Sequence, residues 1–264
     1  MRSMVVEAIQ QTTPINIQPR KGFLSADVLK LIAISAMLID HIAWLFLSTD
    51  SALGIICHVL GRLTIPIMCY FIAEGFFYTK SKWKYALRLG IFVIIAHLPY
   101  FFFCLQSFDI TWQGFLSGLL STSVMLPLLL GLIALIVIHT KNMNSVLKIV
   151  MVVALGLLSI LGDWSWYAFL WIIGFSVFRG KKKLQMIFFA SIAAVFVLMQ
   201  TLPPLINGDS NWVVNLFQLG LFLAIPLLMM HSSLPKPRRA LKWSFYVFYP
   251  LHLLILVLIK VLIN

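Results

Sequence analysis

Charged residues are scarce in this chain, and acidic residues are the scarcer of the two signs. Asp, Glu, Lys and Arg together make up 11% of the 264 residues, against about a quarter in typical soluble domains. Hydrophobic residues make up 61%, and the mean hydropathy is +1.00. This balance excludes a soluble globular domain and indicates an integral membrane protein.

Cysteine is scarce as well. Cys57, Cys69 and Cys104 lie within apolar stretches and lack C-x-x-C spacing, so neither a disulfide framework nor a metal site is predicted. The sequence also lacks an internal repeat, a Walker motif and a dinucleotide-binding motif. The net charge of +12 is not gathered in a basic domain outside the membrane, which argues against nucleic-acid binding.

Long apolar runs follow one another along the chain, separated by short polar stretches. Because a hydrocarbon core of roughly 30 Å needs about 20 apolar residues per helix, these runs predict transmembrane helices. About nine are expected, at residues 27–48, 53–78, 86–106, 115–138, 146–162, 164–179, 184–203, 212–231 and 242–262. The fifth and sixth are short, so either could be tilted or partly re-entrant. The predicted fold is an all-α, polytopic membrane helix bundle in the lipid bilayer.

The connecting loops alternate in charge. The loops that follow odd-numbered segments carry no lysine or arginine but hold Asp50, Asp109, Asp163 and Asp209. Because basic loops stay in the cytoplasm, this pattern predicts a cytoplasmic N-terminus and an external C-terminus. Residues 1–22 are expected to be a mobile cytoplasmic tail rather than a secretory signal, and residues 23–264 a single transmembrane domain.

Polar residues inside apolar segments are costly, so each needs a partner or a function. The stretch AISAMLIDHIAWLF places Asp40 and His41 side by side, about 100° apart around the helix. They could be a buried polar pair between helices, or His41 could accept a proton while Asp40 orients it. Lys30 lies eleven residues before His41, about 16 Å away on the same helical face. One interpretation of Lys30 is an interfacial anchor that pairs with Asp27.

Segment two is richer in polar residues, because HVLGRLTIPIMCYFIAEGF contains His58, Arg62, Pro66, Tyr70 and Glu74. Arginine keeps its charge, so Arg62 requires an anion, and Asp40 is the nearest candidate by depth. Alternatively, the guanidinium could stabilise negative charge on a carbonyl oxygen. Pro66 is expected to kink this helix. A pair of Glu74 with Lys80 or Lys30 is one interpretation, and substrate positioning is the other.

Near the end of the sequence, FYVFYPLHLLIL places Tyr246, Tyr249 and His252 on one helical face. Such aromatic stripes usually serve packing in membrane helices. The alternative is that Tyr249 and His252 position a substrate.

Four stretches together resemble the TraX family of membrane acetyltransferases, which is named for the protein that acetylates the N-terminus of F-type conjugative pilin. They are LKLIAISAMLIDHIAWLF, GRLTIPIMCYFIAEGFFYTKSKWKYALRL, GDWSWYAFL and FYVFYPLHLL, and the match is best over residues 25–106. The family is distantly similar to the acyltransferase-3 membrane enzymes. Their first helix carries a basic residue, ten intervening positions and a catalytic His, a spacing that Lys30 and His41 meet, although Lys replaces the usual Arg.

The resemblance implies acetyl transfer from cytoplasmic acetyl-CoA to an amine or hydroxyl at the membrane or outer face of the bacterial cytoplasmic membrane. Together with the polar residues described above, it predicts catalysis by His41, Asp40 and Arg62, coenzyme binding by Lys30, Lys80, Lys82, Lys84 and Arg88, and substrate positioning by His58, Tyr70, Glu74, Tyr249 and His252. The expected acceptor is the N-terminus of a pilin-like protein. O-acetylation of a cell-surface glycan, a proton-coupled transporter and a non-catalytic pilus or envelope assembly factor stay open.

Overall fold

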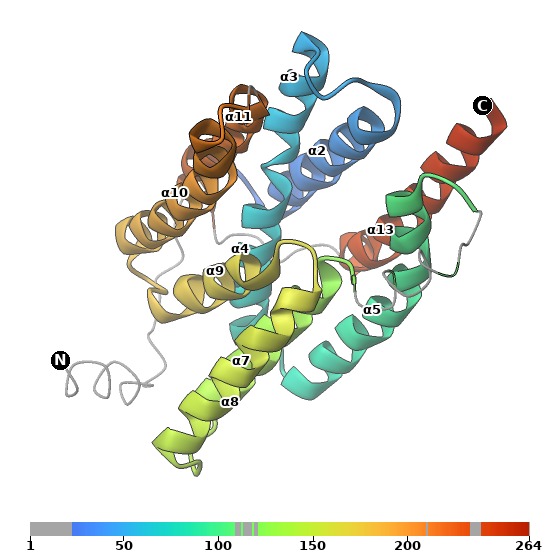
Figure 1. Ribbon diagram of the computed structural model, residues 1–264. Helices are drawn as coiled ribbons and strands as arrows, with labels where there is room; N and C mark the ends of the chain where they lie inside the picture. Colours follow the sequence, from blue (N-terminus) through green and yellow to red (C-terminus); the bar gives the residue numbers. More distant parts are fainter. Residues whose placement is uncertain are drawn as a thin grey trace.

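The computed structural model describes residues 23–108, 112, 118, 121–209, 211–232 and 239–263, and this part of the chain is a bundle of helices without β-strands (Figure 1). Its elements are α2 (Ala26–Phe46), α3 (Ala52–Gly61), α4 (Thr64–Tyr78), α5 (Lys82–Leu105), α7 (Met125–His139), α8 (Ser145–Leu158), η1 (Ser159–Leu161), α9 (Ser165–Val177), α10 (Lys182–Ile206), α11 (Asn211–Val214), η2 (Asn215–Leu223), α12 (Ala224–Met229) and α13 (Arg239–Ile263). The all-α prediction is therefore confirmed. The expected tail, residues 1–22, and Asp109 lie outside the described residues.

Six helical segments among the described residues are long and apolar enough to cross a membrane, so this is a multi-pass membrane protein. They are Ala26–Phe46, Ala52–Tyr78, Lys82–Leu105, Lys182–Ile206, Trp212–Met229 and Tyr246–Ile263. Three further apolar helices are shorter: Met125–His139, Ser145–Leu161 and Ser165–Val177. The count of nine spans and the orientation of the termini stay predictions.

Within the fourth expected segment, 115–138, helix α7 begins at Met125. Shortly before this helix, the backbone of Thr122 pairs with a second segment. Thr122 N–H donates to the Leu161 carbonyl, and Asp163 N–H donates to the Thr122 carbonyl, both at 2.8 Å. These bonds hold Thr122 in a bridge beside Gly162, the residue that follows η1.

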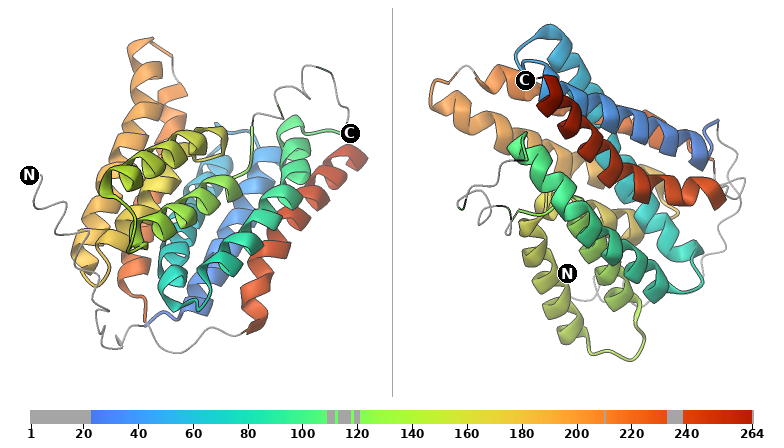
Figure 2. Two further views of the ribbon diagram at one scale, coloured as in Figure 1. Left: turned by 90° about the horizontal axis from the view of Figure 1, so that it is seen from below. Right: turned by 90° about the vertical axis from the view of Figure 1, so that its right-hand side faces the viewer.

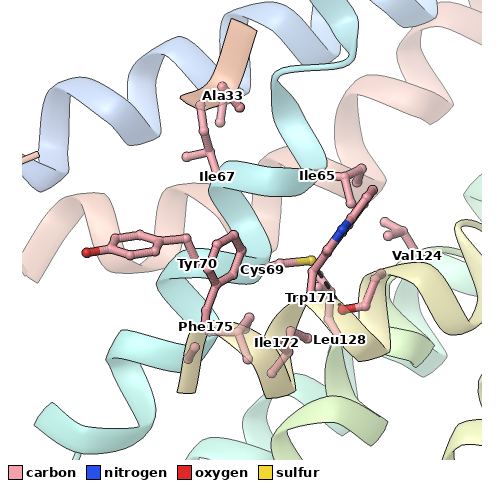
Figure 3. Close-up of a cluster of buried hydrophobic side chains, with 14 of the residues drawn as sticks. Ala33, Ile65, Ile67, Cys69, Tyr70, Val124, Leu128, Trp171, Ile172 and Phe175 are labelled. Atoms are coloured by element: carbon pink, nitrogen blue, oxygen red, sulfur yellow. Dashed lines mark hydrogen bonds between the residues drawn. The ribbon is translucent and has the colours of Figure 1, made fainter. Parts of the chain in front are cut away.

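The core of the bundle lies where α4 packs against α2, α7 and α9. Figure 3 shows its centre, in which Trp171 and Phe175 of α9 meet Cys69 of α4 and Leu128 of α7. The Cys69 thiol is fully buried and donates to the Ala168 carbonyl at 3.5 Å, so Cys69 serves as a small core residue. Helix α8, by contrast, has no buried residue and lies at the edge of the bundle (Figure 1).

The break between α3 and α4 confirms the expected effect of Pro66. Proline has no N–H, so it cannot donate to the carbonyl four residues earlier, which belongs to Arg62. The helix is interrupted at Arg62 and Leu63 and resumes at Thr64. Thr64 then donates its hydroxyl to the Ala33 carbonyl at 3.1 Å, so α4 is tied to α2 beside the break.

The remaining long helices surround this broken pair. Helix α13 packs along both α2 and α5 (Figures 1 and 2), and η2 packs against α3 and α10. The approach of η2 to α3 is close enough that a Cβ at Gly220 would collide with the Val59 carbonyl. Unlike the other long segments, η2 is a 3₁₀-helix of nine residues, whereas such helices are usually short.

Candidate active site

A cavity of about 460 Å³ lies between the helices. Its wall is formed by residues of α2, the α3–α4 break, α5, the start of α9, α10, η2 and α13. Four residues that the sequence singled out line it: Asp40, His41, Arg62 and Tyr249. The contributions of α2, α5 and α10 come from the C-terminal halves of these helices. The cavity is therefore nearer to one end of the bundle, which we call the cavity end.

An ion pair between α2 and the helix break forms part of this wall. The Nη2 group of Arg62 donates to both carboxylate oxygens of Asp40, at 3.0 and 3.2 Å, which confirms the pairing expected from their depths. Room for it exists because Gly61 has no side chain; a Cβ there would collide with Asp40. His58 adds a third contact, since its Nδ1 lies 2.8 Å from Asp40 Oδ1.

Arg62 is held on its other sides as well. Its Nε donates to the His58 carbonyl and its Nη1 to Gln218 Oε1, each at 3.3 Å. The guanidinium carbon lies 5.1 Å from the ring centroid of Trp164 and 5.0 Å from that of Phe217, within the range of cation–π attraction. These contacts give the buried guanidinium one defined position.

His41 is oriented by His252, and not by Asp40 as expected. The Nδ1 of His41 lies 2.8 Å from Nε2 of His252, whose Nδ1 lies 2.7 Å from the Phe248 carbonyl. A carbonyl only accepts, so His252 carries a proton on Nδ1. With both rings neutral, His252 accepts at Nε2 and His41 donates from Nδ1. The Nε2 of neutral His41 is consequently left as a proton acceptor in a side chain that lines the cavity.

The other predicted positioning residues do not line the cavity. His58 is fully buried behind Asp40, with its ring against Trp44 and Phe217. The Tyr70 hydroxyl lies 3.0 Å from Lys182 Nζ. Glu74, for which a pair with Lys80 or Lys30 was one interpretation, forms its ion pair with Arg179.

Both oxygens of Glu74 accept from Arg179, at 3.1 Å. The reason is that α4 packs along α9, and Arg179 directly follows that helix. Helices α5 and α10 begin at this same end of the bundle. We call it the basic end and define it by Lys80, Lys82, Lys84, Arg179 and Lys182.

The five residues expected to bind the coenzyme are not among those that line the cavity in the described part of the chain. Lys30 Nζ lies 5.3 Å from the Phe71 ring centroid, and Lys82 Nζ lies 5.4 Å from that of Phe76. Arg88 lies over the rings of Tyr85 and Tyr246. Lys80 and Lys84 are exposed. Contact of these side chains with a coenzyme stays a prediction.

Several polar residues of the wall were not singled out as site residues: Tyr100, Cys104, Asp163, Gln200 and Gln218. Asp163 is the most informative of them. It belongs to the GDWS segment (residues 162–165), in which Trp164 and Ser165 have φ angles of 61° and 45°. Non-glycine residues with such left-handed backbone angles are uncommon outside constrained sites. Desolvation by the surrounding protein raises the pKa of Asp163 to about 6, while the Arg62 guanidinium lowers it.

These features define a multi-pass membrane protein with a charged and aromatic cavity between its helices. The chain belongs to the TraX protein family, whose model matches residues 25–260. It is 33% identical over 235 residues to the probable fimbrial assembly protein FimC, serogroup H1, of Dichelobacter nodosus, which covers 88% of this chain and 94% of that protein. No solved structure matches the chain.

Proposed function

We propose that this protein is a membrane acetyltransferase that moves an acetyl group from acetyl-CoA to an amine or hydroxyl acceptor. The observation that carries the proposal is the chain of contacts from the Phe248 carbonyl through His252 to His41. It leaves His41 Nε2 able to take a proton, in a side chain of the cavity wall. A general base of this kind is what attack on a thioester carbonyl requires.

In the proposed reaction, His41 Nε2 takes the proton of the acceptor while the acceptor nitrogen or oxygen attacks the acetyl carbonyl. The C–S bond of the tetrahedral intermediate then breaks, and the proton passes from His41 to the departing thiolate. The products are the acetylated acceptor and free coenzyme A, so atoms and protons balance. His252 keeps His41 in the required tautomer.

Arg62 is the proposed stabiliser of the oxyanion. A guanidinium has five N–H donors, and the contacts to His58, Gln218 and Asp40 leave one Nη1 hydrogen without an acceptor among the described residues. A fixed cationic donor can stabilise negative charge that develops on a carbonyl oxygen. The ion pair with Asp40 would hold this donor in place rather than orient the base.

The basic end of the bundle supports acetyl-CoA as the donor, because coenzyme A carries phosphates and phosphates bind lysine and arginine. The axial distance from Lys30 to His41 is about 16 Å, a length that an extended pantetheine arm spans. For the acceptor, the name of the FimC relative favours a pilin-like protein. O-acetylation of a surface glycan is the alternative that uses the same base.

The test is transfer from radiolabelled acetyl-CoA in membranes that contain the wild type or His41→Ala, with label measured in protein, lipid and glycan fractions. We expect His41→Ala to abolish labelling, because the base is lost. His97→Ala is the matched control, since His97 lies in α5 and does not line the cavity. Full activity of His41→Ala would overturn the assignment of the base.

A second candidate is a non-catalytic pilus assembly factor, which the name of the FimC relative also favours. It predicts that His41→Ala supports pilus assembly as well as the wild type does, and that neither membrane consumes acetyl-CoA. Wild-type membranes that neither label any fraction nor bind the coenzyme would support this candidate or a transporter.

A further inference from the structure

The charges on the cavity wall do not cancel. Asp40 and Arg62 form an ion pair, so together they contribute no net charge. Asp163 is a second acid on the same wall, and no cation other than Arg62 lines the cavity in the described part of the chain. With His41 and His252 neutral, the wall carries one net negative charge when Asp163 is ionised. Such a cavity favours a cationic group on whatever enters it.

Backbone contacts hold Asp163 in the wall. Its N–H donates to the Thr122 carbonyl at 2.8 Å, and its Oδ1 accepts from the N–H of Trp164 at 2.9 Å. The left-handed backbone at Trp164 and Ser165 then turns the chain directly into α9. Two hydrogen bonds within a short segment thus fix the position of Asp163. A carboxylate held in one position can bind a ligand in a defined geometry.

Aromatic rings provide much of the remaining wall. Tyr100, Trp164, Tyr167, Phe196 and Tyr249 all line the cavity, and Trp164 stacks on Phe196 with centroids 5.2 Å apart. The faces of such rings carry partial negative charge and attract ammonium groups. A carboxylate among aromatic rings is therefore suited to a primary ammonium, whereas a neutral hydroxyl would gain less from it.

We propose that Asp163 is a specificity-determining residue, which binds the primary ammonium group of the acceptor and selects amines over hydroxyls. This inference rests on the proposed function. In the balanced reaction, His41 takes one proton from the bound ammonium and passes it to water, and the freed amine attacks the acetyl carbonyl. The C–S bond breaks, and the second amine proton goes to the thiolate. The products are the amide, coenzyme A and one released proton.

The test measures binding, so it does not depend on turnover. The purified full-length protein in lipid nanodiscs is titrated calorimetrically with the dipeptide amide Ala-Phe-NH₂ and with lactoyl-Phe-NH₂, in which a hydroxyl replaces the ammonium. We expect the wild type to bind the ammonium probe about tenfold more tightly or better, as a hydrogen bond to a charged group allows. Asp163→Asn should reduce this preference to within about twofold and leave binding of the hydroxyl probe unchanged.

Three features keep this test decisive. Asn at position 163 retains an oxygen that can accept from Trp164 N–H, so the loop contact survives. Asp163→Glu keeps the charge and should keep the preference. Asp50→Asn is the matched control, because Asp50 is an exposed acid of the α2–α3 loop that does not line the cavity, and it should behave as the wild type.

A preference that persists in Asp163→Asn overturns the inference, and so does equal loss of both probes or a wild type without preference. Acetyl transfer to the two probes, measured separately with radiolabelled acetyl-CoA, tells the two proposals apart. Transfer that is insensitive to Asp163 would leave the acetyltransferase proposal standing without this inference. An Asp163-dependent preference for the ammonium probe without acetyl transfer would support ammonium binding by Asp163 and contradict the acetyltransferase proposal.

Discussion

Two arginine–carboxylate pairs involve the α3–α4 helix pair, one at the break between the helices and one near the end of α4. They differ in what surrounds them. Arg62 and Asp40 meet at the cavity end, where Gln218, His58 and two aromatic rings complete the contacts of the guanidinium. Arg179 and Glu74 meet at the basic end, where both oxygens of Glu74 accept from the guanidinium. Their side chains are similarly buried, with exposed fractions of 8% and 14% in the first pair and 15% each in the second.

The difference between the pairs is access to the cavity. Arg62 and Asp40 line it, whereas Arg179 and Glu74 do not. Burial and hydrogen bonding alone therefore do not distinguish a residue of the site from one that only connects helices. The position of the pair relative to the cavity does.

The largest effect is expected from Arg62→Met. This change leaves the Asp40 carboxylate buried without its countercharge, which costs about 3–5 kcal/mol of stability, and it removes the proposed oxyanion donor. Thermal unfolding of the purified protein in micelles measures the first loss, and acetyl transfer in membranes measures the second. The double variant Asp40→Asn with Arg62→Met is the control and should recover much of the stability but not the transfer. Unchanged unfolding of Arg62→Met would show that the ion pair contributes little.

A smaller effect, confined to turnover, is expected from His252→Gln. The side chain keeps some volume but no longer fixes the tautomer of His41, so kcat should fall by about 10- to 100-fold. The KM for acetyl-CoA should stay within about twofold. Steady-state release of free thiol measures both constants.

His97→Gln is the matched control for this change, because it alters a histidine of α5 outside the cavity wall. A His252→Gln protein with unchanged kcat would remove His252 from the proposed base. A fall in kcat together with a lower unfolding temperature of the His252→Gln protein would mean that the contact between His41 and His252 serves packing instead.

The smallest effect is expected from Glu74→Gln. An amide oxygen can still accept from Arg179, so we expect a loss of about 1–2 kcal/mol in stability and more than half of the wild-type transfer rate. The same unfolding and transfer measurements apply. If Glu74→Gln abolished transfer at full stability, the two pairs would be functionally equivalent and the comparison would fail.

Much of the fold followed from local patterns in the sequence. Apolar runs predicted helices, and Pro66 predicted the break beside Arg62, because hydropathy and a missing N–H act within a few residues. The pairing of Arg62 with Asp40 was predicted from depth alone, since consecutive antiparallel helices place equal depths side by side.

Contacts between distant segments could not be predicted in this way. His41 and His252 are 211 residues apart, and Glu74 and Arg179 are 105 apart, so their pairing depends on which helices become neighbours. Asp163 was visible only as an acid in a loop. Its place in the cavity wall depends on the bridge between Thr122 and Gly162, and no local sequence pattern predicts that bridge.

The 3₁₀ winding of η2 has a consequence for the ligands of Arg62. A 3₁₀-helix rises about 2.0 Å and turns about 120° per residue, against about 1.5 Å and 100° in an α-helix. Over the nine residues of η2, these differences amount to ~4.5 Å in length and ~180° in rotation. Rewinding the segment as an α-helix would carry Gln218 away from Arg62 and change which residue faces Val59. The 3₁₀ winding of η2 therefore allows Gln218 to accept a hydrogen bond from Arg62.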